Sequence, residues 1–250
     1  NSSSLASERL TKVLDLKATE TVGEYAKKQQ VSEFALFFTL YGLCISRWTG
    51  QDKLFMGSTF LNRMSKKEKN TLGMFVSSNS VMFSIDRDKS FEENQKQNVV
   101  HIMEAIRHQK YTYGQLMEQM HKVGIDRLYD VVINYQNARL TSEQKATATW
   151  HHCGSQIEGL IIHIRSDYEG RLEFHYDYQT GRYEKWEMEQ LHKHFKELLQ
   201  KVLQQPQITV DELCKISMEE EKRVTVDFNK TLLLNPSHNT VVELFEEQVE

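Results

Sequence analysis

The sequence has little proline, with two residues in 250, and little glycine, with 11. These counts exclude a collagen-like chain and a proline-rich linker. The chain has only three cysteines, Cys44, Cys153 and Cys214, which lie far apart and form no C-x-x-C pair. We therefore expect neither a disulfide framework nor a structural zinc site, and we place the protein in a reducing compartment, the cytoplasm.

An excess of one charge is also lacking, because 31 basic residues stand against 35 acidic ones and leave a net charge of −4. This balance argues against a nucleic-acid partner and a membrane partner. The longest apolar run, residues 34–46, includes Thr39, Tyr41 and Gly42 and is shorter than the about 20 residues of a membrane span. The amino-terminal Asn1-Ser-Ser-Ser also lacks the basic and apolar regions of a secretory signal.

Apolar residues are frequent enough for a folded core, at 39% of the chain against 26% charged residues. A chain of this length buries about three quarters of the surface that it exposes when unfolded. The segments 157–164 and 171–178 flank a turn and predict a hairpin. Alternating or β-branched apolar residues predict further strands at 9–16, 54–60, 80–85 and 128–135.

Helical spacing and capping residues predict the helices. A helix over residues 33–49 begins after Ser32, ends before Gly50 and is apolar nearly all round. Ser90 and Glu93 have the spacing of a capping box and open another helix. Further helices are expected at residues 18–26, 115–122 and 191–202. Strands interleaved with helices predict an α/β layered fold with a mixed β-sheet and flanking helices.

The composition changes after about residue 205. The remaining residues contain a charge run at 219–223, the turn Asn235-Pro236 and a short charged helix at 241–249 without a core of its own. We interpret residues 206–239 as a linker and residues 240–250 as the start of another domain.

The histidines are the first candidates for chemistry. A doublet such as His151-His152 can act as a general base when a carboxylate orients the ring. Gln156 occupies the position four residues after His152, however, and the next aspartate is Asp167. We therefore interpret the doublet as a solvated loop pair.

Other patterns have ordinary explanations as well. His163 and His175 lie on opposite arms of the predicted hairpin, and two imidazoles without a third ligand favour cross-strand surface packing over a metal site. His192 and His194 are two positions apart on a helix and face different directions. The basic stretch 66–69 contains an acid and no aromatic residue, so we expect a solvated loop.

No catalytic set is complete on these residues alone. The glycines form no phosphate-binding pattern. Ser58 and Ser77 stand outside any nucleophile elbow. The residues by themselves predict no catalytic residue and no metal site in this chain.

Four segments, in a fixed order, are more specific. They are GSTFLNR at residues 57–63, LGMFVSS at 72–78, HQKYTY at 108–113 and YDVVINYQN at 129–137. They resemble the motifs GxxxxxR, (I/V)GxFVNT, HQDYPFE and FxVxFNxQN of the condensation domain of nonribosomal peptide synthetases, with Ser77 and Ser78 in place of Asn and Thr. Residues 227–231 and 242–248 resemble the linker and opening helix that precede an adenylation domain.

The resemblance implies a chloramphenicol-acetyltransferase-like layered lobe. A condensation domain has two such lobes with a tunnel between them, where the amine of an acceptor aminoacyl thioester attacks a donor acyl or peptidyl thioester. The family's catalytic HHxxxDG lies in the first lobe, so residues 1–205 are expected to be the C-terminal lobe and to be inactive alone. The alternative is a non-catalytic scaffold or carrier-protein docking module of the same fold.

The resemblance also implies site residues and partners. The expected tunnel residues are Ser58, Arg63, Phe75, Ser77, Asn134 and Gln136. The other motif positions are Gly73, His108, Gln109 and Asn137. No cofactor is expected to bind this chain directly, since partner carrier domains present 4′-phosphopantetheine. The expected partners are the N-terminal lobe, the donor and acceptor peptidyl carrier domains and a downstream adenylation domain.

Overall fold

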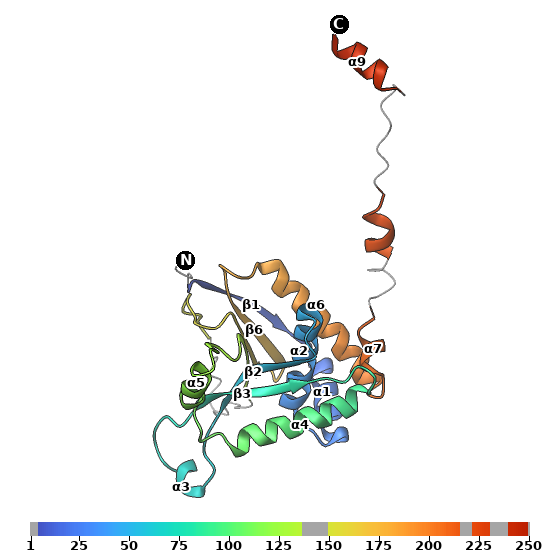
Figure 1. Cartoon of the computed structure of the whole chain (residues 1–250). Helices are drawn as coiled ribbons and strands as arrows, with labels where there is room; N and C mark the ends of the chain where they lie inside the picture. Colours follow the sequence, from blue (N-terminus) through green and yellow to red (C-terminus); the bar gives the residue numbers. More distant parts are fainter. Residues whose placement is uncertain (1–4, 137–149, 216–221, 231–239, 250) are drawn as a thin grey trace. The chain divides into compact units, whose positions relative to one another are not determined.

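The structure is a computed structural model that describes residues 5–136, 150–215, 222–230 and 240–249 (Figure 1). The chain divides into two units, residues 1–213 and 214–250. The first unit ends with the short helix α7 (Val210–Leu213), whose two terminal side chains are buried. The Val210 N–H also donates to the Lys89 carbonyl oxygen (3.0 Å).

A six-stranded mixed sheet lies at the centre of the first unit. Its strands, in spatial order, are β1 (Ser7–Val13), β6 (Leu172–Gln179), β5 (Leu160–Ser166), β4 (Val131–Gln136), β2 (Lys53–Phe60) and β3 (Ser77–Ser84). β2 and β5 both run parallel to β4, and the other neighbouring strands are antiparallel. The predicted hairpin is confirmed as β5 and β6, and the α/β fold class is confirmed.

The helices of this unit flank the sheet (Figure 1). They are α1 (Leu16–Gln29), α2 (Glu33–Thr49), α3 (Lys66–Lys69), α4 (Phe91–Arg107), α5 (Tyr113–His121), α6 (Lys185–Gln204) and α7. The predicted ends of α2 are confirmed, because the Ser32 side chain accepts a hydrogen bond from Ala35 N (3.1 Å) and Gly50 adopts the left-handed conformation.

The first strand ends earlier than expected. Its alternation suggested an end at Leu16, but β1 ends at Val13. Asp15 accepts a hydrogen bond from Ala18 N (2.8 Å) and begins α1. A local capping interaction thus overrides a weak strand pattern.

The connection between β2 and β3 also differs from expectation. The basic stretch at residues 66–69, expected as a loop, forms the one-turn helix α3, which Ser65 and Glu68 open with a capping box. β3 starts at Ser77 rather than Ser80, because its polar first residues pair with the end of β2.

Helix α2 is buried on every side from Ala35 to Ser46. It packs against α1, α4, α6 and the strands β2 and β3. The Tyr41 ring stacks on Phe195 of α6 with 4.4 Å between the centroids. At Gly42 the helix approaches the Phe83 ring of β3 so closely that an added Cβ would lie 2.3 Å from it. The sheet and the helices therefore share one core around α2.

A buried chain of hydrogen bonds crosses this core. The hydroxyls of Tyr41 and Tyr176 are 2.6 Å apart, and the Tyr176 hydroxyl lies 2.8 Å from Nδ1 of His192. Burial lowers the pKa of His192 to about 4, and the positive charges of Lys12 and Lys196 act in the same direction. The two tyrosine hydroxyls and the neutral His192 therefore form one buried, hydrogen-bonded chain.

Helix α4 lies along the outer edge of β3 and covers it with side-chain hydrogen bonds. Asn98 exchanges two hydrogen bonds with the backbone of Ser84, both at 3.1 Å. His101 Nδ1 lies 3.2 Å from the Met82 carbonyl oxygen, and Asn94 binds the next backbone groups along this edge. An open strand edge recruits other strands, so this cover protects the sheet from edge-to-edge association.

The second unit contains a short π-helical turn, η1 (Arg223–Asp227), and the helix α9 (Val241–Val249). Asn229 Nδ2 donates to the Thr225 carbonyl oxygen (2.8 Å). The expected helix at residues 241–249 is confirmed, whereas the linker assignment of residues 206–239 stays a prediction. In the described parts of the chain, no helix is long and apolar enough to cross a bilayer.

Replacement of Asn98 by alanine tests the cover over the β3 edge. We expect Asn98→Ala to lower the free energy of unfolding by about 2–4 kcal/mol, because two backbone groups of the half-buried Ser84 lose their partner, each costing the lower part of the about 1–3 kcal/mol of a fully buried group. Urea unfolding measures the loss. Val100→Ala, at an exposed position of the same helix, should cost less than about 1 kcal/mol. Equal stability of the two variants would contradict this role.

The low pKa of His192 predicts a pH dependence of stability. The unfolded state, with a pKa of 6.5 for this residue, binds more protons than the folded state between pH 6.5 and about 4. The stabilisation is therefore complete above pH 6.5 and is lost as the pH falls. Between pH 7 and 5, wild type should lose about 2 kcal/mol more than His192→Gln, at about 1.4 kcal/mol per pKa unit. Unfolding curves of the two proteins at both pH values measure the difference. The exposed His108→Gln should behave like wild type, and parallel losses in wild type and His192→Gln would refute the assignment.

Candidate functional site

Side-chain alternation divides the predicted tunnel residues between the two faces of the sheet. Ser58 is aligned with Ile133 on the next strand, and the strand registers place Ile133 on the same face as Tyr176, which contacts α2. Asn134 and Gln136 lie on the opposite face. The sheet therefore does not bring the six residues into one cluster.

The hydroxyl groups of the two predicted serines, Ser58 and Ser77, are both buried. Ser58 is 2% exposed, and its hydroxyl donates to the Ile133 carbonyl oxygen (2.9 Å). The Ser77 hydroxyl oxygen is buried and has no hydrogen-bond partner among the described residues. The Ser58 hydroxyl is thus committed to the junction of β2 and β4.

Arg63 holds together the connection between β2 and β3, residues 61–76, which we call the Arg63 loop. Its guanidinium donates to three backbone carbonyl oxygens, those of Glu68, Thr71 (2.7 Å) and Gly73 (2.7 Å). The guanidinium also lies 4.2 Å from the centroid of the Phe75 ring. These contacts fix one loop conformation and place two predicted tunnel residues, Arg63 and Phe75, side by side.

Two further motif positions shape the same loop. Gly73 has a φ of +142°, a conformation that residues with a Cβ rarely adopt. Gln109 is 5% exposed, and its side-chain oxygen accepts a hydrogen bond from Asn62 N (3.0 Å). Its backbone oxygen accepts another from Asn79 Nδ2 (3.2 Å). Gly73 and Gln109 therefore support the loop architecture.

Glu68 forms hydrogen bonds within the Arg63 loop and to Lys110. Its carboxylate accepts hydrogen bonds from the backbone N–H groups of Ser65 and Met64 (both 2.8 Å) and from Lys110 Nζ (3.0 Å). These bonds, with that from Ser65 the strongest, lower the pKa of Glu68 to about 2. Glu68 is ionised at neutral pH, and Lys110 balances its charge.

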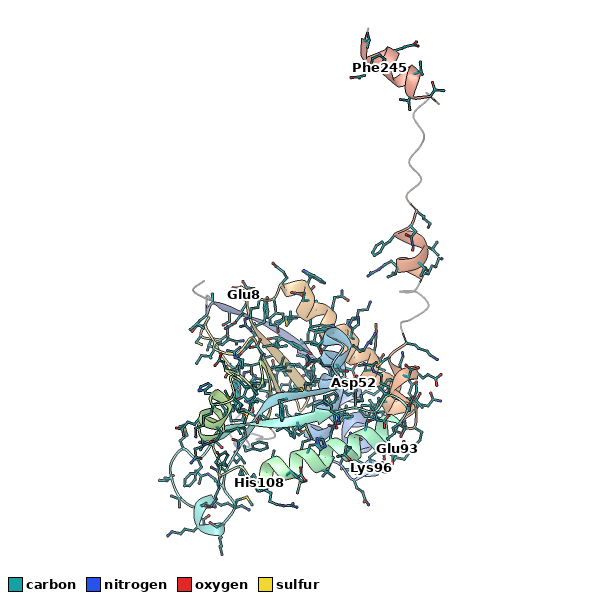
Figure 2. All side chains as sticks on the ribbon, viewed as in Figure 1. Glu8, Asp52, Glu93, Lys96, His108 and Phe245 are labelled. Carbon is teal, nitrogen blue, oxygen red and sulfur yellow. The ribbon has the colours of Figure 1, made fainter. Side chains whose placement is uncertain are left out.

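The remaining motif positions lie apart from these contacts. His108, at the end of α4 (Figure 2), is exposed, and its backbone oxygen accepts a hydrogen bond from Tyr111 N (2.9 Å). Asn137 lies outside the described residues. Gln136 is half-buried at the end of β4.

The sheet face opposite α2 carries a polar cluster that sequence reasoning missed. Asp177 of β6 accepts two hydrogen bonds from Arg9 of β1, at 2.6 and 2.7 Å. His152 and His163 each lie 3.4 Å from the same carboxylate. The predicted tunnel residue Asn134 joins the cluster through His163, with 3.2 Å between Nδ2 and Nδ1.

Asp177 stays ionised in this cluster although it is 4% exposed. Burial would raise its pKa, but hydrogen bonds from Arg9 and His163 outweigh burial and hold the pKa of the Asp177 carboxyl well below its ordinary value. The Arg9–Asp177 pair therefore neutralises charge inside the sheet face, and loss of one partner would leave a buried, uncompensated charge.

The interpretation of His151-His152 as a solvated pair is wrong for His152. Its side chain is 14% exposed, with Nδ1 facing Asp177 and Nε2 lying 2.9 Å from the Ser7 hydroxyl. The orienting carboxylate comes from β6 and not from the residues that follow the doublet. The residues next to the doublet in the sequence therefore could not reveal this carboxylate.

Ser7, His152 and Asp177 follow one another in the order of a hydrolytic triad. The surroundings of Asp177 and Ser7, however, are not those of a catalytic triad. Asp177 is already paired with Arg9. Ser7 is 7% exposed, and its backbone N–H donates to the Gly154 carbonyl oxygen (2.9 Å). A buried serine whose own N–H is occupied offers no oxyanion hole.

The expected cross-strand pairing of His163 and His175 is confirmed, since the two are directly opposite in the β5–β6 register. The expected surface position is wrong for His175, which is 4% exposed because Trp150 stacks over its ring. Burial lowers the pKa of His175 to about 4. The Arg165 guanidinium lies 4.8 Å from the Trp150 ring and holds it in place.

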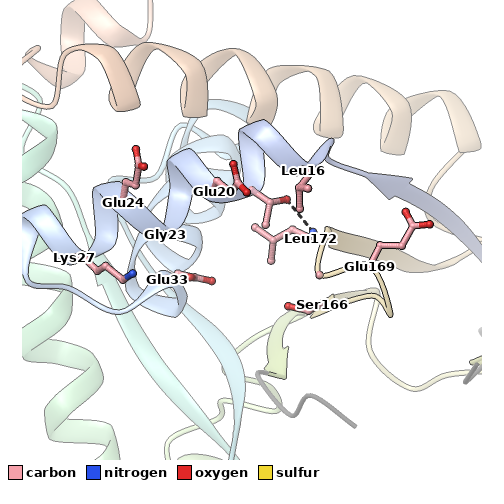
Figure 3. Close-up of a pocket in the computed structure, with 11 residues that line it drawn as sticks. Leu16, Glu20, Gly23, Glu24, Lys27, Glu33, Ser166, Glu169 and Leu172 are labelled. Atoms are coloured by element: carbon pink, nitrogen blue, oxygen red, sulfur yellow. Dashed lines mark hydrogen bonds between the residues drawn. The ribbon is translucent and has the colours of Figure 1, made fainter. Parts of the chain in front are cut away.

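A pocket of about 570 Å³ lies between α1, the start of α2 and the β5–β6 turn (Figure 3). Its charged lining consists of Glu20, Glu24, Lys27, Glu33 and Glu169. None of the predicted tunnel residues lines it. Across the described residues, no group of three His, Cys, Asp or Glu side chains could hold a metal ion.

Conservative replacement of Arg63 tests its hold on the loop. Arg63→Lys keeps the charge but loses the planar set of donors, so backbone amides at residues 64–75 should exchange at least about tenfold faster with solvent. Hydrogen exchange by mass spectrometry measures this, while the unfolding free energy should change by less than about 1 kcal/mol. Arg107→Lys, at the end of α4, is the control. Unchanged exchange in Arg63→Lys would disprove the role.

Comparison with known proteins identifies the family. The family described as Condensation domain matches residues 1–225. Surfactin synthase subunit 1 of Bacillus subtilis (strain 168) is 27% identical over 99% of this chain, and tyrocidine synthase 3 of Brevibacillus parabrevis is 26% identical over 94%. The chain spans only 7% and 4% of the lengths of these two proteins.

Solved structures share the fold. The first condensation domain of the CDA synthetase superposes with a TM-score of 0.70 and 14% identity over 85% of this chain and 48% of its own. A four-domain nonribosomal peptide synthetase, holo-AB3403, superposes with a TM-score of 0.75 and 15% identity over 86% of this chain and 18% of its own. With a family match over residues 1–225, this chain belongs to the condensation domain family of nonribosomal peptide synthetases.

Proposed function

We propose that this chain is the C-terminal lobe of a condensation domain and forms one wall of the tunnel in which a peptide bond is made. The observation that carries the proposal is the overlap with a solved condensation domain. That overlap takes in 85% of this chain but 48% of the solved domain, as expected for one of two similar lobes.

In the proposed reaction, the amine nitrogen of the acceptor aminoacyl thioester attacks the carbonyl carbon of the donor thioester. The C–N bond forms, the C–S bond breaks, and the donor thiol leaves while the amine gives up a proton. Carrier domains present both substrates on 4′-phosphopantetheine arms, and the HHxxxDG of the partner lobe supplies the base. The part left to this chain is positioning and electrostatic stabilisation.

The proposed tunnel residues have different parts in this scheme. Arg63 acts as a positioning residue for Phe75, because its donors are used on the loop backbone. Ser58 holds the junction of β2 and β4 behind that wall, and Ser77 opens β3 at the end of the Arg63 loop. Asn134 and Gln136 are half-buried on the sheet face opposite α2, and their amides are suited to substrate carbonyl oxygens.

We further propose the larger setting of the chain. The relatives are synthases that are much longer than this chain. By analogy with them, we infer a cytoplasmic multidomain synthetase. In it, this lobe contacts an N-terminal lobe, donor and acceptor peptidyl carrier domains and a downstream adenylation domain.

Reconstitution tests the proposal. The 250-residue chain is mixed with loaded donor and acceptor carrier domains, with and without the N-terminal lobe of the surfactin synthase condensation domain, and the dipeptidyl product is measured by mass spectrometry. We expect no product from the chain alone and product when the second lobe is present. Asn134→Ala should lower the rate by about tenfold or more, and Gln204→Ala, exposed on α6, should not.

Two results would overturn the proposal. Product from the chain alone that disappears in His152→Ala would assign the chemistry to the polar cluster. Binding of both the second lobe and the carriers without product, under conditions where the intact surfactin domain is active, would favour the non-catalytic docking module.

A further inference from the structure

His163 of β5 lies between polar side chains of the two neighbouring strands. On one side, its Nδ1 is 3.2 Å from Nδ2 of Asn134, which is its register partner on β4. On the other side, its Nε2 is 3.4 Å from a carboxylate oxygen of Asp177 on β6. The His163 side chain is 18% exposed, so little water competes for these contacts. Both ring nitrogens therefore face protein groups of known chemistry.

Asp177 determines which ring nitrogen of His163 carries the proton. The Asp177 carboxylate is ionised and can only accept hydrogen bonds. A bare Nε2 would turn its lone pair toward this negative charge, whereas a protonated Nε2 turns a positive hydrogen toward it. Because a neutral imidazole carries one N–H, a proton on Nε2 leaves Nδ1 as an acceptor.

The charges around His163 are already balanced. Two ion pairs and two imidazoles lie around it on this face of the sheet: Arg9–Asp177, Arg165–Glu173, His152 and His175. Each arginine neutralises one carboxylate, and burial lowers the pKa of His175 to about 4, so that its ring is neutral at neutral pH. A proton added to His163 would meet no unpaired carboxylate among the described residues of this cluster.

The bare Nδ1 of His163 fixes how the Asn134 amide is turned. Only the amide nitrogen can donate to this acceptor, so Nδ2 is directed toward His163. The amide oxygen, Oδ1, lies on the other side of the planar group. Among the described residues, the Asn134 side chain has no second hydrogen-bond partner. Oδ1 is therefore available as an acceptor, and the second N–H of Nδ2 stays available to a carbonyl oxygen.

We propose that His163 is a positioning residue, which orients the Asn134 amide so that Oδ1 accepts a hydrogen bond from the attacking amine. An acceptor for one N–H of the amine fixes the direction of the nitrogen lone pair, which must face the thioester carbon for the C–N bond to form. The reversed amide would set N–H groups against the amine N–H. This use of the orientation rests on the proposed function, whereas the orientation itself does not.

The tautomer of His163 tests the orientation without any substrate. In the isotope-labelled 250-residue chain at about pH 8, where an ordinary histidine is neutral, NMR correlations between ring nitrogens and ring protons distinguish a protonated nitrogen from a bare one. We expect a protonated Nε2 and a bare Nδ1. The Asn134 side-chain amide resonance, identified by its loss in Asn134→Ala, should shift in His163→Leu. A protonated Nδ1 in wild type would overturn the proposal.

The reconstituted reaction, with the second lobe and loaded carriers, tests what the orientation does. We expect His163→Leu to lower kcat about tenfold and to leave KM for the acceptor substrate within about twofold, since binding energy away from the amine is unchanged. His163→Gln can still donate to Asp177 and accept from Asn134, so it should restore most of the rate. In an Asn134→Ala background, His163→Leu should cause no further loss, because the two residues act as one unit.

A matched control and a fold check accompany these variants. His121→Leu removes an exposed histidine at the end of α5 and should keep the wild-type kcat. Circular dichroism verifies the fold of each variant. Full activity of His163→Leu, or losses that add up in the double variant, would refute the positioning role. A wild type that makes no product with the second lobe would overturn the proposed function and this use of Asn134, while the tautomer would still decide the orientation.

Discussion

The burial of α2 on every side is the constraint on which the first unit depends. A helix that is apolar all round must be covered by several elements at once. The sheet covers one side, and α1, α4 and α6 cover the others. The contact is close enough at Gly42 that no larger residue fits against Phe83. Chain segments far apart in sequence are thereby brought to one core, with Tyr41 bound to Tyr176 and stacked on Phe195.

Because side chains alternate along a strand, the residues that face α2 determine which residues lie on the opposite face of the sheet. Alternation sends Tyr176 into the core and its neighbours His175 and Asp177 to the opposite face. There the side chains are still largely buried, so the charge of Asp177 requires Arg9 as its partner. A cluster of ionisable groups therefore lies beside Asn134, on the sheet face that is turned away from the core around α2.

The β2–β3 hairpin is covered along the outer edge of β3 and exposed at the connection between its two strands. Along the outer edge of β3, Asn94, Asn98 and His101 satisfy the backbone and remove a surface that other strands could pair with. At the turn, Arg63 holds Leu72 and Met74 in full exposure. A covered strand edge and an exposed connection thus coexist within one hairpin. Two family motif positions, Gly73 and Gln109, shape this connection through its backbone.

Local interactions explain what the sequence by itself determined. The ends of α2 follow from Ser32 and Gly50, the start of α4 from Ser90 and Glu93, and the β5–β6 hairpin from a turn of a few residues. Each of these depends on groups close together in the chain, so spacing and residue type suffice to predict them. The motif order that indicates the family is likewise a property of the linear sequence.

Only the tertiary structure decided the surroundings of the candidate site. His152 receives its carboxylate from Asp177 on another element, and the edge of β3 receives its partners from the polar face of α4. The opposite faces of Ser58 and Asn134 depend on the register between β2 and β4, which are separated by three helices and a strand. Such contacts are set by which strands become neighbours and by a register with a period of two residues. That information comes from packing around α2, and no local pattern in the sequence contains it.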